Sequence, residues 1–210
     1  MQPFVVLEGI AAPLDRSNVD TGQILPARFL RRPRGDGYQD FLFRDLRFRP
    51  DGSENPEFIL NKAPYRAARI LVADSNFGAG SSREQAVWGL TDYGIRCVIA
   101  VDFGDIFHAN CFNGGLLPVR LPAATCAKLR RQLHANPGTS LRVDLPAQAV
   151  TGPDGSTYGF EVEGSRKLRL LEGLDDIAAT LRHEAAISAF EQSYRKRFDW
   201  LFDSPKASAS

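Results

Sequence analysis

The chain has 210 residues, of which 43% are hydrophobic and 24% are charged. These fractions are ordinary for a globular protein, so they exclude a chain that is disordered or collagen-like throughout. Lysine and arginine number 26 against 25 aspartate and glutamate residues, which gives a net charge of +1. Such a balance provides no overall field for holding nucleic acid or an anionic membrane.

The longest stretch without a charged residue covers residues 106–119 and includes His108, Asn110 and Asn113. A membrane-spanning helix needs about 20 apolar residues, so we expect none here. The chain does not open on a basic segment followed by an apolar run, which is the pattern of a signal peptide. We therefore expect a cytoplasmic protein.

The first third of the chain gives weak structural signals. Residues 4–7 form a short apolar run, which predicts a strand ended by Gly9. Residues 11–37 are polar and contain several prolines and glycines, which indicates loops. Residues 38–48 alternate aromatic and charged side chains, a pattern that fits either a helix or an irregular packed segment, and residues 50–61 again indicate a loop.

The clearest pattern lies in the middle of the chain. A β-branched apolar run predicts a buried strand at 69–73, followed by a glycine turn at 76–80. Apolar residues at helical spacing predict a helix over 81–93, which Gly94 ends, and a second buried strand follows at 97–101. One short crossover between two strands makes a β-α-β unit and a parallel strand pair.

The remaining segments continue as mixed α and β structure. We expect a helix at 105–112, a strand at 116–121, a helix at 123–135, short strands at 141–145, 149–150 and 158–162, and helices at 175–183 and 185–197. Residues 204–210 indicate a frayed tail. The chain is thus predicted to form one compact α/β domain over 1–203.

The three cysteines, Cys97, Cys111 and Cys126, are widely spaced, and His108 and Cys111 are the only pair at ligand spacing. Zinc and iron–sulfur sites need several such ligands brought together. An odd number of cysteines without a signal peptide also argues against a disulfide framework. We expect reduced, buried thiols and no metal site in this chain.

The segment Phe77-Gly-Ala-Gly-Ser-Ser-Arg-Glu84 carries the strongest chemical signal. Gly78 and Gly80 allow close backbone approach, and the helix that follows presents unpaired N–H groups and the positive end of its dipole. These features predict an anion site beside two serines and an arginine. The spacing of Ser81 and Glu84 also fits a capping box, in which the serine only caps the helix.

One functional alternative is a dinucleotide site. Gly78 and Gly80 follow a strand, and Asp102 ends the next strand about 20 residues later. Arg83, however, occupies the third glycine position, where close packing of helix on strand requires no side chain.

The other alternative is a site for a substrate with several carboxylates, and here the sequence resembles a family. The segment 78–84, Leu90-Thr-Asp-Tyr-Gly-Ile95, Gly104-Asp-Ile-Phe107 and Asn113-Gly-Gly-Leu-Leu-Pro-Val119 resemble the small subunit of 3-isopropylmalate dehydratase. Near the start, Asn18-Val-Asp-Thr-Gly-Gln-Ile-Leu-Pro26 is similar to that family's N-V-D-T-D-x-I-x-P element. Residues 174–181 fit its C-terminal part, so the resemblance covers about residues 4–200.

The resemblance implies the swivelling β/β/α domain that forms the fourth domain of aconitase-like enzymes. It implies a large subunit as partner, in a heterodimer or higher assembly, and that partner would carry a 4Fe–4S cluster, with no cofactor on this chain. It implies the interconversion of 2-isopropylmalate and 3-isopropylmalate, which are dicarboxylates, in leucine biosynthesis.

The resemblance also implies residue roles. Ser81 matches a serine that acts as an alkoxide base, Arg83 an arginine that pairs with a substrate carboxylate, and Ser82 a hydrogen-bond donor. Thr21 and Arg31 would contact the substrate, although a solvated surface arginine is the alternative for Arg31. Asp20, Gly78 and Gly80 would form the supporting loops.

Three positions depart from the family pattern. Gly22 replaces the second aspartate of the early motif, Ala79 replaces a cysteine, and Gln85 replaces a frequent histidine. Gly22 leaves open a paralogous small subunit that acts on another substituted malate, and a dicarboxylate- or dinucleotide-binding module without catalysis remains a further alternative. The basic run 195–197 is too short to indicate nucleic-acid binding.

Overall fold

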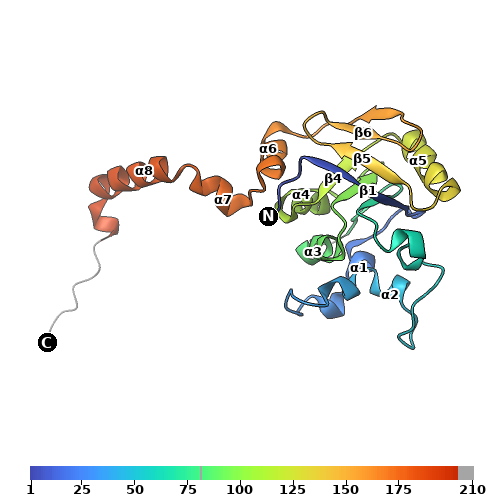
Figure 1. Ribbon diagram of the computed structural model, residues 1–210. Coiled ribbons are helices and arrows are strands. Elements are labelled where there is room, and N and C mark those ends of the chain that lie inside the picture. Colours follow the sequence, from blue (N-terminus) through green and yellow to red (C-terminus); the bar gives the residue numbers. More distant parts are fainter. Residues whose placement is uncertain (81, 203–210) are drawn as a thin grey trace. The chain divides into compact units, whose positions relative to one another are not determined.

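The computed structural model describes residues 1–80 and 82–202 (Figure 1). The chain divides into two units, residues 1–173 and residues 174–210. The first unit contains the β-sheet, and the described part of the second unit, residues 174–202, is helical. The expected domain limits of 1–203 and 204–210 stay a prediction, and the expected tail lies outside the described residues.

A seven-stranded sheet forms the first unit, with the strand order β4-β3-β2-β1-β5-β6-β7. The strands are β1 (Val6–Pro13), β2 (Ile70–Val72), β3 (Cys97–Ala100), β4 (Leu117–Arg120), β5 (Ser140–Asp144), β6 (Ala149–Thr151) and β7 (Thr157–Gly159). Strands β1 to β4 are parallel, and β5 to β7 are antiparallel to their neighbours. The expected parallel pairing of the strands near 69–73 and 97–101 is confirmed, since Ile70 lies opposite Cys97.

Strand β1 is longer than expected and joins the two halves of the sheet. Its first half pairs with β5, and Ala11 to Pro13 pair with β2. The strand does not stop at Gly9, because Gly9 lies in register opposite Leu141 and continues the ladder. Strand β4 lies at one edge of the sheet and contains Pro118, which lacks an N–H group and is tolerated in an edge strand.

The helices of the first unit are α1 (Thr21–Ile24), α2 (Arg44–Arg47), α3 (Glu84–Tyr93), α4 (Asp105–Gly114), α5 (Ala123–Ala135) and α6 (Gly164–Glu172). Four short 3-10 turns accompany them: η1 (Ala27–Phe29), η2 (Tyr38–Phe41), η3 (Ile59–Asn61) and η4 (Ala63–Tyr65). The aromatic-rich stretch 38–48 thus forms two short helical turns. Helix α6 was not expected, because its run of basic and apolar residues opens on glycine and serine.

Both faces of the parallel part of the sheet are buried, whereas β5 has exposed residues in alternation with buried ones. Leu71 and Val98 point into one apolar cluster, which also contains residues of α1 and α3. Ile70 and Ile99 point into a second cluster with residues of α5. Figure 1 accordingly shows α3 and α5 on opposite sides of the sheet. This arrangement explains why the parallel strands are continuous apolar runs, since strands covered on both faces show no alternation.

The second unit contains α7 (Asp176–Leu181), α8 (Glu184–Arg197) and the 3-10 turn η5 (Asp199–Leu201). The two terminal helices expected from the sequence are therefore confirmed. Among the described residues, no helix has both the length and the apolar character needed to cross a membrane.

The contact between the loops that follow β2 and β3 can be tested with Gly104. A Cβ atom added there would lie 2.5 Å from the carbonyl oxygen of Gly78, and the Gly104 backbone is otherwise compatible with alanine. Because the obstacle is backbone, we expect Gly104→Ala to lower the free energy of unfolding by about 1–3 kcal/mol.

The matched control is Gly164→Ala at the first residue of α6, where an added Cβ has no neighbour within 4 Å. We expect this change to be neutral or to stabilise the protein by about 0.4–1 kcal/mol. Chemical denaturation of both variants checks the pair. Equal stability of the two variants would contradict the packing described here.

Candidate active site

The loops that follow β1 and β2 lie side by side beyond the ends of their strands. The amide of Gly78 donates to the carbonyl of Val19 at 2.7 Å, and the amide of Thr21 donates to the carbonyl of Ala79 at 2.9 Å. Asp20 and Ala79 form an isolated parallel bridge. The early motif at 18–26 and the glycine loop are thus brought together, at the carboxyl edge of parallel strands where α/β sheets place their binding sites.

Asp20 serves as the N-cap of α1. Its Oδ1 atom accepts from the Gln23 amide at 2.8 Å, and its Oδ2 atom accepts from the Gln23 side chain at 3.0 Å. Burial acts to raise the pKa of Asp20, but the hydrogen bonds from Gln23 and Gly22, with the positive charge of Arg83, outweigh it and lower the pKa. Asp20 is therefore held as a carboxylate beside Arg83.

Arg83 lies half-buried between the two motifs. Its Nη1 atom donates to the carbonyl of Leu25 at 3.3 Å. A Cβ atom at Gly22 would lie 2.8 Å from that same nitrogen and 3.0 Å from Oδ1 of Asp20. The missing side chain at residue 22 therefore makes room for the guanidinium, which fills the space where the family's usual aspartate would begin.

Gly78 and Gly80 both require glycine, because their φ angles are +75° and +92°. A Cβ atom at Gly78 would also lie 2.2 Å from Cγ of Phe107. At Gly80, the nearest side-chain atoms to an added Cβ belong to Asp20 and Thr21, at 3.8 and 3.9 Å. The supporting-loop residues named from the sequence, with the buried Thr21, are therefore neighbours in space.

Helix α3 begins at Glu84, three residues later than expected. Its N-cap is Arg83, whose side chain makes no capping hydrogen bond. A capping box over 81–84 would need the helix to begin directly after Ser81, whereas the described helix begins at Glu84; the role of Ser81 itself stays a prediction. Ser82 is exposed in the preceding loop. Ser81, the predicted base, lies outside the described residues.

Arg31 lies exposed in the loop after η1. Among the described residues, no hydrogen bond or ion pair joins its side chain to Asp20 or Arg83, so its substrate contact stays a prediction.

Two asparagines that the sequence analysis did not single out hold the loops in place. The side chain of Asn76 donates to Oδ1 of Asn18 at 2.8 Å, and both residues have positive φ angles. The backbone amide of Asn76 donates to Oδ1 of Asp102. Asp102, the acidic residue noted for the dinucleotide alternative, thus accepts a hydrogen bond from the neighbouring loop. Asparagine next to a glycine turn is the available sequence signal, since it tolerates the left-handed region.

The described residues offer no metal centre, because no group of three His, Cys, Asp or Glu side chains lies close enough to hold an ion. Cys97, Cys111 and Cys126 are buried, as expected. Burial raises the pKa of the Cys97 and Cys111 thiols and raises that of Cys126 to about 11. Protonated, buried thiols are poor metal ligands.

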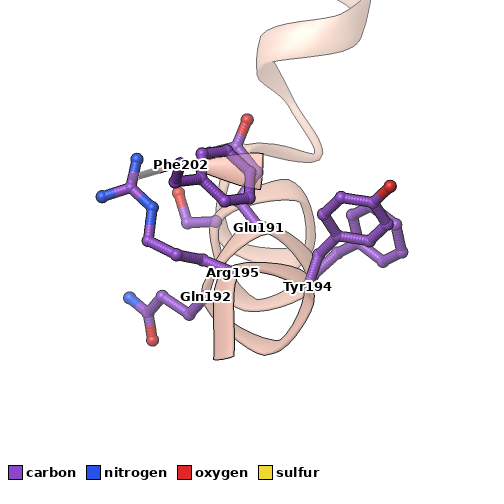
Figure 2. A pocket seen from close by; sticks show the side chains of 7 residues that line it. Glu191, Gln192, Tyr194, Arg195 and Phe202 are labelled. Atoms are coloured by element: carbon purple, nitrogen blue, oxygen red, sulfur yellow. The ribbon is translucent and has the colours of Figure 1, made fainter. Parts of the chain in front are cut away.

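A groove on α8 and η5 lies in the second unit and contains none of these residues (Figure 2). Its lining is aromatic and polar, with the Arg195 guanidinium 4.9 Å from the centre of the Phe202 ring. The loops after β1 and β2, which hold the residues predicted from the motifs, remain the candidate site.

The capping role of Asp20 gives a pH-dependent prediction. A carboxyl whose folded pKa is lowered stabilises the fold above its unfolded pKa of about 4, and the contribution is lost as the pH falls through the folded value. We expect Asp20→Ala to lower the free energy of unfolding by about 0.5–2 kcal/mol at pH 7, and the difference from the native chain to shrink below pH 4.

Asp20→Asn is the control, because asparagine caps helices well but carries no charge. Its loss of stability at pH 7 should be smaller than that of Asp20→Ala, whereas the part that varies with pH should be the same in both variants, because both remove the same titrating carboxyl. Urea denaturation between pH 3 and 7 measures both variants, and a pH-independent loss in Asp20→Ala would contradict the lowered pKa.

Comparison with known proteins places this geometry in a family. Residues 1–124 match the aconitase C-terminal domain, residues 127–164 match LeuD_N, and residues 176–204 match the C-terminal domain of the 3-isopropylmalate dehydratase small subunit. A solved structure of 3-isopropylmalate dehydratase from Methanocaldococcus jannaschii has a TM-score of 0.62 at 24% identity, covering 88% of this chain and 98% of that chain. The expected aconitase-like mixed α/β fold is thereby confirmed.

The 3-isopropylmalate dehydratase small subunit of Gluconacetobacter diazotrophicus is 50% identical over 95% of this chain and 97% of its own length. The small subunit from Nitrobacter winogradskyi is 49% identical over 95% of this chain and its own full length. The resemblance inferred from the motifs is confirmed: the chain belongs to the family of 3-isopropylmalate dehydratase small subunits.

Proposed function

We propose that this chain is the small subunit of a cytoplasmic hydro-lyase that interconverts 2-isopropylmalate and 3-isopropylmalate in leucine biosynthesis. The observation that carries the proposal is the meeting of the two motifs at one sheet edge. Arg83, which precedes α3, lies against Gly22 and the carbonyl of Leu25 from the early motif. In a member of this family, this arrangement would place the Arg83 guanidinium and the N-terminus of α3 next to the substrate.

Arg83 and the start of α3 supply carboxylate recognition. A guanidinium binds a carboxylate through two parallel hydrogen bonds, and the N-terminus of a helix favours an anion. Helix α3 has 10 residues, and Ser82 lies just before its start in the sequence. The Thr21 hydroxyl lies across the loop pair, next to Gly80. These groups hold one carboxylate of a malate-type substrate in a fixed orientation.

Ser81 serves as the base that removes the proton from the carbon next to a carboxylate. A serine hydroxyl is a very weak acid, and a helix terminus contributes only about 0.3–2 kcal/mol, or at most roughly one and a half pKa units. Arg83 and converging hydrogen-bond donors must supply the rest, in a site from which water is excluded. The loops lie at an open edge of this chain, so the partner has to close the site.

The partner is the large subunit, in a heterodimer or a higher assembly, and the 4Fe–4S cluster belongs to that partner. The three thiols of this chain do not fit a cluster, because they are buried on separate elements and their pKa values are raised. The small subunit therefore contributes the base and the carboxylate contacts only.

Gly22 favours a second candidate of the same class, a small subunit for another substituted malate. An aspartate at this position would bring a carboxylate to the guanidinium of Arg83, and here glycine leaves Arg83 with the carbonyl of Leu25. A change in the charge next to the carboxylate-binding residue alters which substrates are accepted.

Reconstitution tests the proposed function. The chain is combined with a cluster-loaded large subunit from the same organism, and turnover of isopropylmalates and other substituted malates is measured. Activity is expected only in the complex, and Ser81→Ala should reduce kcat by orders of magnitude. Turnover by the chain alone, or an active Ser81→Ala complex, would refute the assigned role.

The carboxylate contact of Arg83 predicts that lysine cannot replace it, because an ammonium lacks the planar fork. In the complex, Arg83→Lys should raise KM and reduce kcat/KM by about 30-fold to several thousand-fold, equivalent to about 2–5 kcal/mol. Arg66→Lys is the control, since Arg66 pairs with Glu54 at an exposed position. If both variants keep native kcat/KM for every substrate tested, Arg83 does not bind the carboxylate.

A further inference from the structure

Arg130 on α5 joins the two loops of the candidate site at their base. Its Nε atom donates to Oδ1 of Asp15 at 3.0 Å, and its Nη2 atom donates to Oδ2 of Asp74 at 3.1 Å. Its Nη1 atom donates to the carbonyl of Ala73 at 2.6 Å. The side chain is only 10% exposed, and its partners directly follow β1 and β2.

A ladder of backbone hydrogen bonds runs from this point to the site. The amide of Leu14 donates to Val72 at 2.8 Å, and the amide of Asn18 donates to Ser75 at 2.9 Å. Further along the two loops, the amides of Gly78 and Thr21 donate to the carbonyls of Val19 and Ala79. The two loops therefore continue the pairing of β1 with β2, and their spacing at the base determines the spacing at Asp20 and the glycine loop.

The charges at the base make Arg130 necessary for that spacing. Asp15 and Asp74 come from opposite loops, and each places a carboxylate oxygen near the same guanidinium. His134, four residues along α5, lies against the other oxygen of Asp15 at 2.5 Å. Without Arg130 the two carboxylates would repel each other, and the buried carbonyl of Ala73 would lose its donor.

We propose that Arg130 is a positioning residue: it fixes the distance between the loop at 14–20 and the loop at 73–80, and thereby orients Asp20 and Arg83 for substrate. The kinetic part of this inference rests on the proposed function. Lysine should not replace Arg130 fully, because a single ammonium does not reproduce the three directed bonds of the planar fork.

The first experiment is independent of activity. Amide hydrogen exchange of the isolated chain is compared for native, R130K and R130Q proteins. The amides of Gly78 and Thr21, which bridge the loops, should exchange at least about tenfold faster in both variants. The amide of Leu121, which donates to Ala100 at 3.0 Å outside the loop pair, should keep its protection. Uniform loss of protection would overturn the proposal in favour of general destabilisation.

The second experiment uses the complete complex with isopropylmalate. Misplaced loops should raise KM about 10-fold to 100-fold in R130K and R130Q, whereas simple loss of folded protein lowers apparent kcat and leaves KM unchanged. Arg142→Gln, which breaks an exposed pair with Asp144, is the matched control. If R130Q does not fold, Asp74→Asn is used in its place, because asparagine has the shape of aspartate but removes the charge that pairs with Arg130.

Folded R130K with native KM and native exchange at Gly78 and Thr21 would refute the proposal. If the native complex does not turn over isopropylmalates, the proposed function fails, and the exchange measurement still decides the role of Arg130.

Discussion

The structure depends on one strand that pairs in two ways. The first half of β1 is antiparallel to β5, and its second half, Ala11 to Pro13, is parallel to β2. Ala11 and Ala12 are completely buried and point to opposite sides, one into each apolar cluster. Their small side chains let helices approach the centre of the sheet from both faces. A change in the register of β1 would therefore disturb both halves of the sheet and both cores together.

The candidate site inherits its geometry from this pairing. The chain leaves β1 and β2 at the same edge, and backbone hydrogen bonds keep the two segments together as far as Ala79. Side chains then fix the position of the segments: Arg130 at the base, Asn18 and Asn76 midway, and Asp20 at the end. Glycine at 22 leaves room for Arg83, and glycine at 78 and 80 allows the positive φ angles of the loop, so the site is built largely from backbone and its direct contacts.

The central β-α-β unit could be predicted from the sequence because its strands are short β-branched runs and its helix has regular apolar spacing. The site residues could be named because their motifs are contiguous. The contacts that organise these residues could not be predicted, because Asp15 and Arg130 lie 115 positions apart and no local pattern pairs them. Gly9 indicated a strand end, but its missing side chain accommodates Arg69, whose Cβ would lie 3.0 Å from an added Cβ. The start of α3 was misplaced because Ser81 and Glu84 have the spacing of a capping box, whereas the helix begins at Glu84.

The burial of all three cysteines has a consequence for the chemical durability of the chain. Thiolates, not thiols, react with oxidants and alkylating reagents. With Cys97, Cys111 and Cys126 enclosed and their pKa values raised, almost no thiolate is present at neutral pH. Air and thiol reagents therefore find little to attack in this chain while it is folded.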